Sequence, residues 1–383
     1  MNSFESFYFH SFSPEYRIIT AFILAIALNA FTIPIVIRIA REKHLFDIPN
    51  HRTSHINSVP TMGGVGFYFS INMVSLVLIN TCGLNGGQIS NSLFSLPAIL
   101  AGLTLIFFAG MKDDIMNIPA WKKLVAEIIA LIILTVVGDV RIDNMQGIFS
   151  IGELNYSVSL LLSIFTGIVI INAFNLIDGV DGLASSIAML GSVVFGSYFL
   201  ATNEWEYAIF SFTTLGSLIP FFIYNTLGKK NKIFMGDTGS LLLGFVLTVM
   251  VFRFNEMNSI NSIQPYFISG PAFSFAVLIV PLFDTLRVFT IRIYRGGSPF
   301  KADHRHIHHL LLDLGYTHIQ TTVILFTISL FYIAFAYFFN FLGNLILVSI
   351  MVGSFSLLEA FVMALYHKKS IYKAKALEVI IKK

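Results

Sequence analysis

Aspartates placed in short polar segments are the residues of this chain best suited to chemistry. The first segment, AGMKDDIMNIPAWKKL (109–124), carries Asp113 beside Asp114. Adjacent carboxylates repel each other unless a cation or a proton lies between them, so this pair predicts a divalent metal, a shared proton, or both. Lys122 and Lys123 are candidates to neutralise a phosphate. Ordinary helix caps and solvated helix ends are the alternative explanation of any single acid.

The second segment, INAFNLIDGVDGLA (171–184), has a polar side chain at every third position. These residues are Asn172, Asn175, Asp178 and Asp181. A straight helix rotates about 100° per residue and would carry such a series off one face. Gly179 and Gly182 allow the backbone to break after the two asparagines and to fold the acids back. The cluster suits oxygen ligands for Mg²⁺ and polar contacts to a ligand, with a simple turn as the alternative.

The third segment, IFMGDTGSLLLG (233–244), places Asp237 between Gly236 and Gly239, with Ser240 opening an apolar helix. Backbone amides at the start of that helix are expected to face an anion, while Asp237 holds a metal. A plain helix cap by Asp237 is the alternative.

The fourth segment (284–318) begins at Asp284 and carries four arginines, one lysine and five histidines. Zinc is disfavoured because the segment has no HExxH pattern and no cysteine, and its basic residues repel a dication. A cationic loop that grips phosphate oxygens through arginine forks fits better. A surplus of basic residues on the inner side of a membrane explains the arginines but not the histidines.

Composition shows what kind of chain must position these residues. Of the 383 residues, 56% are hydrophobic and 12% are charged, 39 are Phe, and the mean hydropathy is +0.78. Soluble chains are about 25% charged, so an ordinary soluble enzyme, a disordered protein and a nucleic-acid-binding domain are excluded. The single Cys82 excludes a disulfide framework and a cysteine-based zinc site.

Continuous apolar runs predict an all-α, polytopic integral membrane protein with about eleven transmembrane helices. The runs are 17–40, 64–82, 93–111, 121–138, 157–174, 183–201, 206–225, 238–254, 271–291, 320–339 and 342–365. The first is read as a retained helix, because no basic segment precedes it and no small-residue cleavage site follows.

The distribution of basic residues predicts the orientation. With the N-terminus outside and the C-terminus cytoplasmic, 21 of the 24 lysines and arginines fall inside, and only Arg17, Arg141 and Arg253 fall outside. All six acids named above then lie at inner helix ends or in inner loops. Residues 1–365 form one transmembrane helical catalytic domain, and 366–383 a basic cytoplasmic tail that is either solvated or an amphipathic helix on anionic lipid. The external segment 139–158 is expected to form a small hairpin.

Carboxylates for Mg²⁺, glycine turns and a cationic loop on one side of a membrane are the parts needed for phosphoryl transfer. The metal screens charge, a base exposes a nucleophile, and cations hold the leaving phosphate. The membrane setting implies that one substrate is a lipid.

Five motifs resemble those of the polyprenyl-phosphate N-acetylhexosamine-1-phosphate transferases, of glycosyltransferase 4 type, over residues 30–320. They are TMGG (61–64), DDIMNIPAWK (113–122), NAFNLIDGVDGLA (172–184), FMGDTGSLLLG (234–244) and HRHIHH (304–309). The resemblance implies transfer of a sugar 1-phosphate from a UDP-sugar to undecaprenyl phosphate at the cytoplasmic face, with release of UMP. It implies a multi-pass protein of the cell inner membrane.

The resemblance also assigns roles to residues. Asp113 looks like the base that deprotonates the lipid phosphate, with Asp114 and Asp178 in support. Asn175 and Asp237 look like ligands of Mg²⁺, with Mn²⁺ as an alternative. The substrate-binding candidates are Phe234 and Asp181 for uracil, Arg305, His306, His308 and His309 for the diphosphate and sugar, and Asn172 and Lys123.

The His-x-His-His loop resembles the branch that starts O-antigen, enterobacterial common antigen and teichoic-acid synthesis, for which UDP-GlcNAc is the expected donor. Other UDP-HexNAc donors stay open, as does a homodimer. UDP-MurNAc-pentapeptide phosphotransfer is the alternative reaction. A secondary transporter is the non-enzyme alternative, disfavoured because the acids cluster at one interface and no internal repeat is evident.

Overall fold

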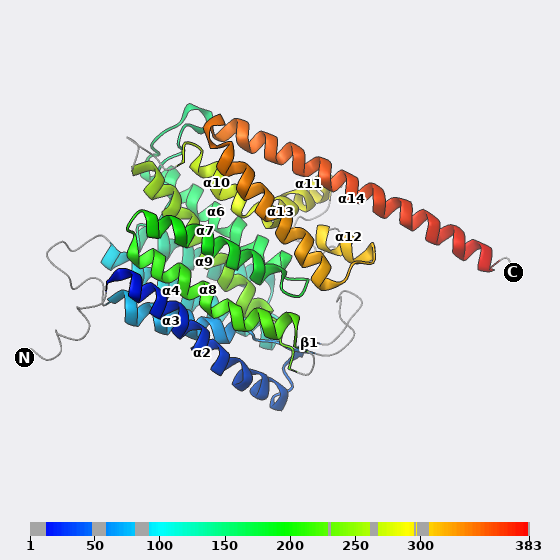
Figure 1. The fold of residues 1–383 in the computed structure, drawn as a ribbon, viewed down its shortest axis with the longest axis horizontal. Coiled ribbons are helices and arrows are strands. Elements are labelled where there is room, and N and C mark those ends of the chain that lie inside the picture. Colours follow the sequence, from blue (N-terminus) through cyan, green and yellow to red (C-terminus); the bar gives the residue numbers. More distant parts are fainter. Residues whose placement is uncertain are drawn as a thin grey trace, which may run out of the picture.

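The computed structural model of the chain describes residues 13–47, 59–80, 92–228, 231–260, 267–294, 296 and 306–381. Helices dominate these residues (Figure 1). The α-helices are α2 (Pro14–Glu42), α3 (Gly64–Asn80), α4 (Ser92–Met116), α5 (Ala120–Ile132), α6 (Tyr156–Ile177), α7 (Leu183–Ala201), α8 (Trp205–Thr226), α9 (Gly236–Ile260), α10 (Gly270–Val277), α11 (Ile279–Tyr294), α12 (Ile307–Asp313), α13 (His318–Phe338) and α14 (Asn344–Ile381). Short elements are the antiparallel strands β1 (Phe46–Asp47) and β2 (Val59–Pro60), the π-helix η1 (Ile133–Val137), and the 3₁₀ turns η2 (Ile148–Ser150) and η3 (Asn340–Leu342).

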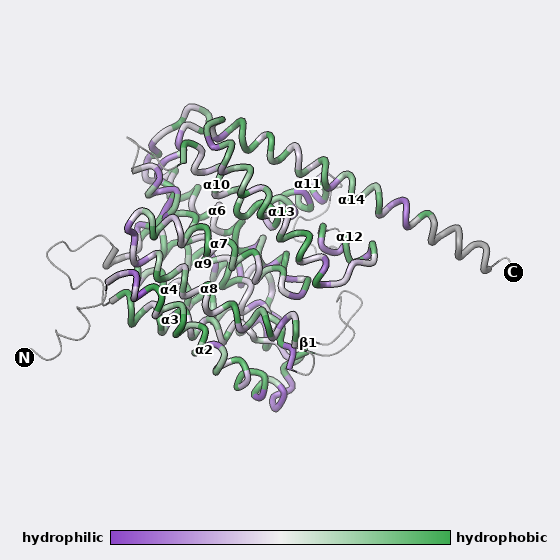
Figure 2. The backbone as a smooth tube through the Cα atoms, viewed as in Figure 1, coloured by the Kyte–Doolittle hydropathy of each residue, from purple (hydrophilic) through white to green (hydrophobic). Residues whose placement is uncertain are grey.

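The predicted all-α polytopic class is confirmed. Within the described ranges, eight helices are long and apolar enough to cross a membrane, or nine if α10 and α11 form one broken span. Every predicted apolar run overlaps a helix, but α3 is short, and the run 121–138 is divided between α5 and η1. Hydrophobic residues occupy most of the length of these helices, and hydrophilic residues gather toward their ends (Figure 2). The number eleven and the orientation stay predictions.

Helix α9 forms the centre of the bundle. Its most apolar window is 89% buried, against 28% for α2 and 22% for α14. It packs against α4, α6, α7 and α3, while α2 packs against α8 and α3 on one side of the bundle (Figure 1). The first turn of α9 is therefore surrounded by other helices, and residues placed there are held on several sides.

Two glycines bring neighbouring helices against that first turn. A Cβ on Gly110 of α4 would lie 2.5 Å from Thr238 Cα, and a Cβ on Gly64 of α3 would lie 2.4 Å from Gly239 N. No real side chain tolerates such distances, so only glycine permits these backbones to approach. The approach brings the end of α4, with its two aspartates, beside the start of α9.

The α10 and α11 axes differ by 84° at Leu278. Pro281 explains the break, because a proline ring clashes with the carbonyl four residues earlier, here that of Val277, the last residue of α10. Helix α11 begins at Ile279, five residues before Asp284, so Asp284 lies in the second turn of α11. The expectation that Asp284 marks a helix end or a loop is wrong.

Two segments outside the long helices were also predicted. In the segment 139–158, where a small hairpin was predicted, an antiparallel bridge pairs Asn144 with Glu153, and backbone hydrogen bonds from Met145 N to Gly152 O and from Leu154 N to Asp143 O flank it. Helix α14 continues without a break to Ile381 and extends beyond the other helices (Figure 1). The predicted boundary at 365 is therefore not marked by any change of secondary structure, and the tail continues the helix.

Candidate active site

Lys123 is the centre of the acid cluster. Its Nζ lies 2.9 Å from Asp113 Oδ2 and 2.6 Å from Asp237 Oδ2. The three side chains are 20%, 12% and 28% exposed and come from α5, α4 and α9. A partly buried ammonium between two carboxylates lowers the cost of placing both negative charges in one site. The positions of Asp113 and Asp237 therefore depend on each other through this lysine.

Asp113 is held at both oxygens. Oδ2 accepts from Lys123, and Oδ1 accepts a hydrogen bond of 2.7 Å from the backbone N–H of Ile118. The side chain is consequently oriented by the α4–α5 connection as well as by the lysine.

Asp114, by contrast, points to α9 and not to Asp113. Its carboxylate accepts hydrogen bonds from Asp237 N (2.7 Å), Thr238 N (3.0 Å) and Thr238 Oγ1 (2.5 Å). It is thus the anion that occupies the positive end of α9. The amides at the start of α9 therefore face an anion, as expected, and that anion is the Asp114 carboxylate. The two adjacent aspartates have different partners, Asp113 in Lys123 and Asp114 in the first turn of α9.

Gly236 makes this capping contact possible. Its φ is +71°, which glycine adopts without strain, and a Cβ there would lie 2.5 Å from Asp114 Oδ2. The Gly-Asp spacing in FMGDTGS is thereby explained by backbone packing.

The two asparagines of α6 have different partners. Asn175 Nδ2 donates to Asp237 Oδ1 at 3.0 Å and to Ser240 Oγ at 2.9 Å. Asn172 Nδ2 donates to Glu127 Oε2 at 2.6 Å. Glu127, a buried acid on α5 one turn after Lys123, is not among the predicted site residues. The signal that identifies it is a lone acid inside an apolar run, which is costly unless it has a function or a partner.

The backbone breaks after the two asparagines, as predicted. Helix α6 ends at Ile177, and Gly182, with φ +77°, precedes α7. Asp178 lies in this break, where burial first, and then the charges of Asp237, Asp181 and Asp114, raise its pKa well above the usual value. Asp178 accepts no hydrogen bond from any residue that the structure describes. It therefore lies near the cluster without belonging to the lysine-centred network.

Asp181 forms a second charged contact in this region. Lys232 Nζ lies 2.5 Å from Asp181 Oδ2 and 5.1 Å from the ring centre of Phe234. His318 Nδ1 is 3.4 Å from the same carboxylate oxygen. The two residues predicted to contact uracil, Asp181 and Phe234, are thus linked by one ammonium group. Lys232 is absent from the predicted site, because in the sequence it reads only as part of a basic run.

The histidine segment is attached to α11 by Asp284. His306 Nδ1 lies 2.8 Å from Asp284 Oδ2, and the backbone N–H of Ile307 donates to Asp284 Oδ1 at 2.9 Å. Asp284 is buried and also accepts from Arg287 at 3.1 Å. This acid therefore positions the start of α12. Arg305, the arginine predicted to bind the diphosphate, lies outside the described residues.

His308 is buried beside the break that follows α6. A Cβ on Gly179 would lie 2.7 Å from His308 Nε2, and the ring centre of His309 is 4.3 Å from that of His308. Neither ring nitrogen of His308 has a hydrogen-bond partner in the described part of the chain. Burial lowers the pKa of His308 well below the usual value, so the ring is neutral.

No group of three or more His, Cys, Asp or Glu side chains within the described ranges is arranged to hold a metal ion. Asp237 and Asn175 carry oxygens of the kind that such a site needs, and Asn175 turns its Nδ2 toward Asp237. An oxygen-only set suits Mg²⁺, which commonly takes one or two carboxylates and completes its shell with water and substrate phosphates.

Comparison with known proteins bears on this geometry. The sequence model of glycosyl transferase family 4 matches residues 96–255, the range that holds Asp113, Lys123, Asn175 and Asp237. This part of the chain is therefore similar to glycosyl transferase family 4. The resemblance read from the motifs is thereby confirmed.

Individual relatives are similar to this chain over most of its length. The undecaprenyl-phosphate alpha-N-acetylglucosaminyl 1-phosphate transferase of Escherichia coli O157:H7 is 28% identical over 291 residues, covering 75% of this chain and 74% of the relative. The protein of the same name from Salmonella typhi is 27% identical over 81% of both chains. The decaprenyl-phosphate N-acetylglucosaminephosphotransferase of Mycobacterium leprae (strain TN) is 28% identical over 73% of this chain and 72% of the relative.

The contacts of Asp114 predict that this residue stabilises the packing of α4 against α9. Asp114→Asn removes the negative charge and replaces one of the two accepting oxygens with an NH2 group, which cannot accept from a backbone N–H; each hydrogen bond to a charged group contributes about 1.5–3 kcal/mol. We expect the free energy of unfolding to fall by at least about 2 kcal/mol. The measurement is SDS-titrated unfolding in mixed micelles, followed by circular dichroism.

The matched control is Asp139→Asn, because Asp139 is 74% exposed and pairs only with Arg141 among described residues. The free energy of unfolding of Asp139→Asn should fall by no more than about 1 kcal/mol. Equal losses in the two variants would contradict the capping role of Asp114.

Proposed function

We propose that the protein transfers a sugar 1-phosphate from a UDP-sugar, UDP-GlcNAc in the first instance, to undecaprenyl phosphate. The observation that carries the proposal is the convergence of Asp113 and Asp237 on Lys123, with Asn175 bonded to Asp237, inside the region that matches the family. The names of the relatives supply the substrate class.

The proposed reaction has a simple balance of atoms. A phosphate oxygen of the lipid attacks the β-phosphorus of the UDP-sugar, a new P–O–P bond forms, and the bond to the α-phosphate breaks with release of UMP. Asp113 takes the proton of the lipid phosphate, because its carboxylate is oriented by Ile118 N and Lys123 Nζ. The attack is direct, since two phosphates held in line need no covalent intermediate on the protein.

Lys123 then has two tasks in this proposal. It keeps the Asp113 and Asp237 carboxylates together while the site is empty of substrate, and its positive charge faces the phosphates when they enter. Asp114 acts indirectly, by fixing the first turn of α9 and thereby the position of Asp237. Asp178 supports proton movement as a buried carboxyl group with a raised pKa.

The nucleotide is assigned to the second charged contact. Phe234 offers a ring face for uracil, and Asp181 offers hydrogen-bond acceptors, with Lys232 holding the two in place. His306, His308, His309 and Arg305 are assigned to the diphosphate and sugar. Asn172, turned toward Glu127, lines the α5–α6 side of the site.

Mg²⁺ is proposed as the cofactor, with Mn²⁺ as a substitute. Asp237 and Asn175 would hold it, and when bound it would screen the charge of the diphosphate. Mg²⁺ is proposed because the candidate ligands offer oxygen donors only, and not because their side chains form a preformed metal site.

We further propose that the reaction takes place at the cytoplasmic face of the inner membrane and starts a lipid-linked cell-surface glycan such as O-antigen or teichoic acid. The charge distribution of the sequence supports this side of the membrane. UDP-MurNAc-pentapeptide is the alternative donor, and mass spectrometry of the lipid product separates the two. Uptake of a solute into proteoliposomes without covalent change would instead favour a transporter.

The proposal predicts a chloroform-soluble labelled product when purified protein meets UDP-[³H]GlcNAc, undecaprenyl phosphate and Mg²⁺. Asp113→Asn should lower turnover by about 10²–10⁴-fold, as expected for loss of a general base. Binding of the UDP-sugar, measured by calorimetry, should survive. The control is Asp313→Asn, an exposed acid of α12 outside the cluster, which should retain activity.

No product from any UDP-HexNAc, beside an active control enzyme, would overturn the proposed reaction. Normal turnover in Asp113→Asn would overturn only the role of that residue.

The metal assignment gives a separate prediction. Asp237→Asn should raise the Mg²⁺ concentration needed for half-maximal activity by about tenfold or more, because a ligand is lost. Asp181→Asn should instead raise KM for the UDP-sugar and leave the Mg²⁺ requirement unchanged. The measurement is a Mg²⁺ titration of initial rates at saturating donor. An unchanged Mg²⁺ requirement in Asp237→Asn would rule out its role as a ligand.

A further inference from the structure

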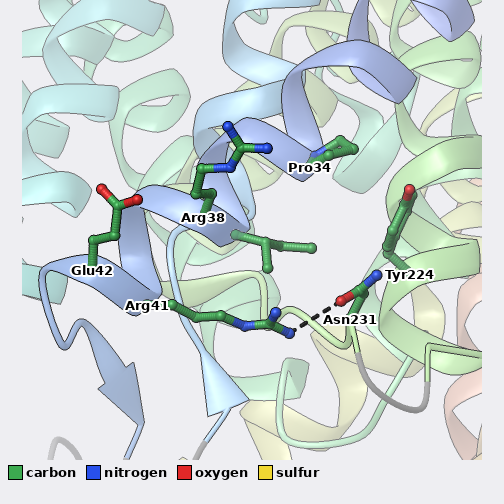
Figure 3. A pocket seen from close by; sticks show the side chains of 7 residues that line it. Pro34, Arg38, Arg41, Glu42, Tyr224 and Asn231 are labelled. Atoms are coloured by element: carbon green, nitrogen blue, oxygen red, sulfur yellow. Dashed lines mark hydrogen bonds between the residues drawn. The ribbon is translucent and has the colours of Figure 1, made fainter.

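A pocket of about 330 Å³ lies between α2, α8 and the segment that follows α8, apart from the acid cluster (Figure 3). Its lining residues are Pro34, Ile37, Arg38, Arg41, Glu42, Tyr224 and Asn231. None of them has a role in the proposed transfer. The pocket combines charged groups with apolar walls, which is unusual for a plain solvated helix end.

The two arginines supply the chemistry. Arg38 and Arg41 are three residues apart on α2 and therefore share one face of the helix. Arg41 Nη2 donates to Asn231 Oδ1 at 3.2 Å, which holds one guanidinium across the pocket (Figure 3). Guanidinium groups bind phosphate oxygens through paired N–H donors. The phenol of Tyr224 and the amide of Asn231 add neutral hydrogen-bonding groups.

The charge of the pocket suggests which phosphate it takes. Two arginines and Glu42 leave a net charge of +1, and the Glu42 carboxylate lies away from the Arg41–Asn231 hydrogen bond (Figure 3). A phosphodiester carries one negative charge, and a free phosphate or a diphosphate carries more. The charge of the lining residues alone favours a monoanionic phosphodiester over a more highly charged phosphate.

The surroundings indicate a lipid rather than a soluble ligand. Ile223 on α8 and Leu227, which follows α8, are 49% and 65% exposed, and Ile35 and Ile39 on α2 are 42% and 49% exposed. Both helices meet the criteria for membrane spans. Basic pockets between transmembrane helices bind acidic lipid head groups. Acyl chains of a lipid held in the pocket would lie along these exposed apolar residues.

We propose that this pocket is a binding site for the phosphodiester head group of an acidic phospholipid such as phosphatidylglycerol. Arg41, oriented by Asn231, binds the phosphate, and Arg38, whose guanidinium points toward the Pro34 side of the pocket, adds positive charge (Figure 3). The site is distinct from the acid cluster, although the segment that holds Asn231 continues into Lys232 and its contact with Asp181.

The test is native mass spectrometry of the purified full-length chain, with phosphatidylglycerol titrated against phosphatidylcholine. The double variant Arg38→Gln/Arg41→Gln should lose at least about tenfold in relative affinity for phosphatidylglycerol, given about 1 kcal/mol per basic residue near a lipid surface. Asn231→Asp keeps both arginines but places a carboxylate beside Arg41, and it should weaken binding in the same direction.

Lys43→Gln is the matched control, because Lys43 caps α2 two residues from Arg41 and does not line the pocket. It should change the relative affinity less than about twofold. An equal loss in Lys43→Gln would show general attraction to charge and overturn the site. Full binding in both pocket variants would also overturn it. Displacement of phosphatidylglycerol by an equal concentration of inorganic phosphate would identify a free-phosphate site and overturn the lipid assignment.

Discussion

The ammonium group of Lys123 is the interaction on which the rest of this structure depends. Asp113 and Asp237 come from helices that are far apart in sequence, and their carboxylates meet at this one cation. Removing one partner of a buried ion pair typically costs about 3–5 kcal/mol, because the remaining charge is left uncompensated. Here one lysine serves two acids, so its loss would leave two charges close together at the ends of packed helices.

The surrounding structure positions Lys123, Asp113 and Asp237 so that these contacts form. Asp114 caps α9 so that Asp237 lies in the first turn, and Gly110 and Gly64 let the neighbouring helices approach that turn. The break after α6 turns Asp178 and Asp181 back toward it. The same features explain how a site rich in charge exists in a chain with 12% charged residues. Its polar groups are gathered at one end of the bundle and bond to one another.

Sequence reasoning predicted the helical class, the approximate spans and the break after Asn175, because apolar length and glycine spacing are local properties. It did not predict that Asp113 and Asp114 face different partners, since that depends on where α9 begins in space. Glu127 and Lys232 were missed for the same reason: their partners, Asn172 and Asp181, are distant in sequence. The position of Asp284 depends on the break between α10 and α11, which an unbroken apolar run does not reveal.

A double-mutant cycle between Lys123 and Asp237 tests the central claim most directly. Unfolding free energies of Lys123→Met, Asp237→Asn and the double variant would be measured by SDS titration in mixed micelles. A shared cation predicts that the double variant is more stable than the sum of the single losses implies, by at least about 1 kcal/mol. Losses that add to within about 0.5 kcal/mol would show that the two residues do not interact, and would contradict the account.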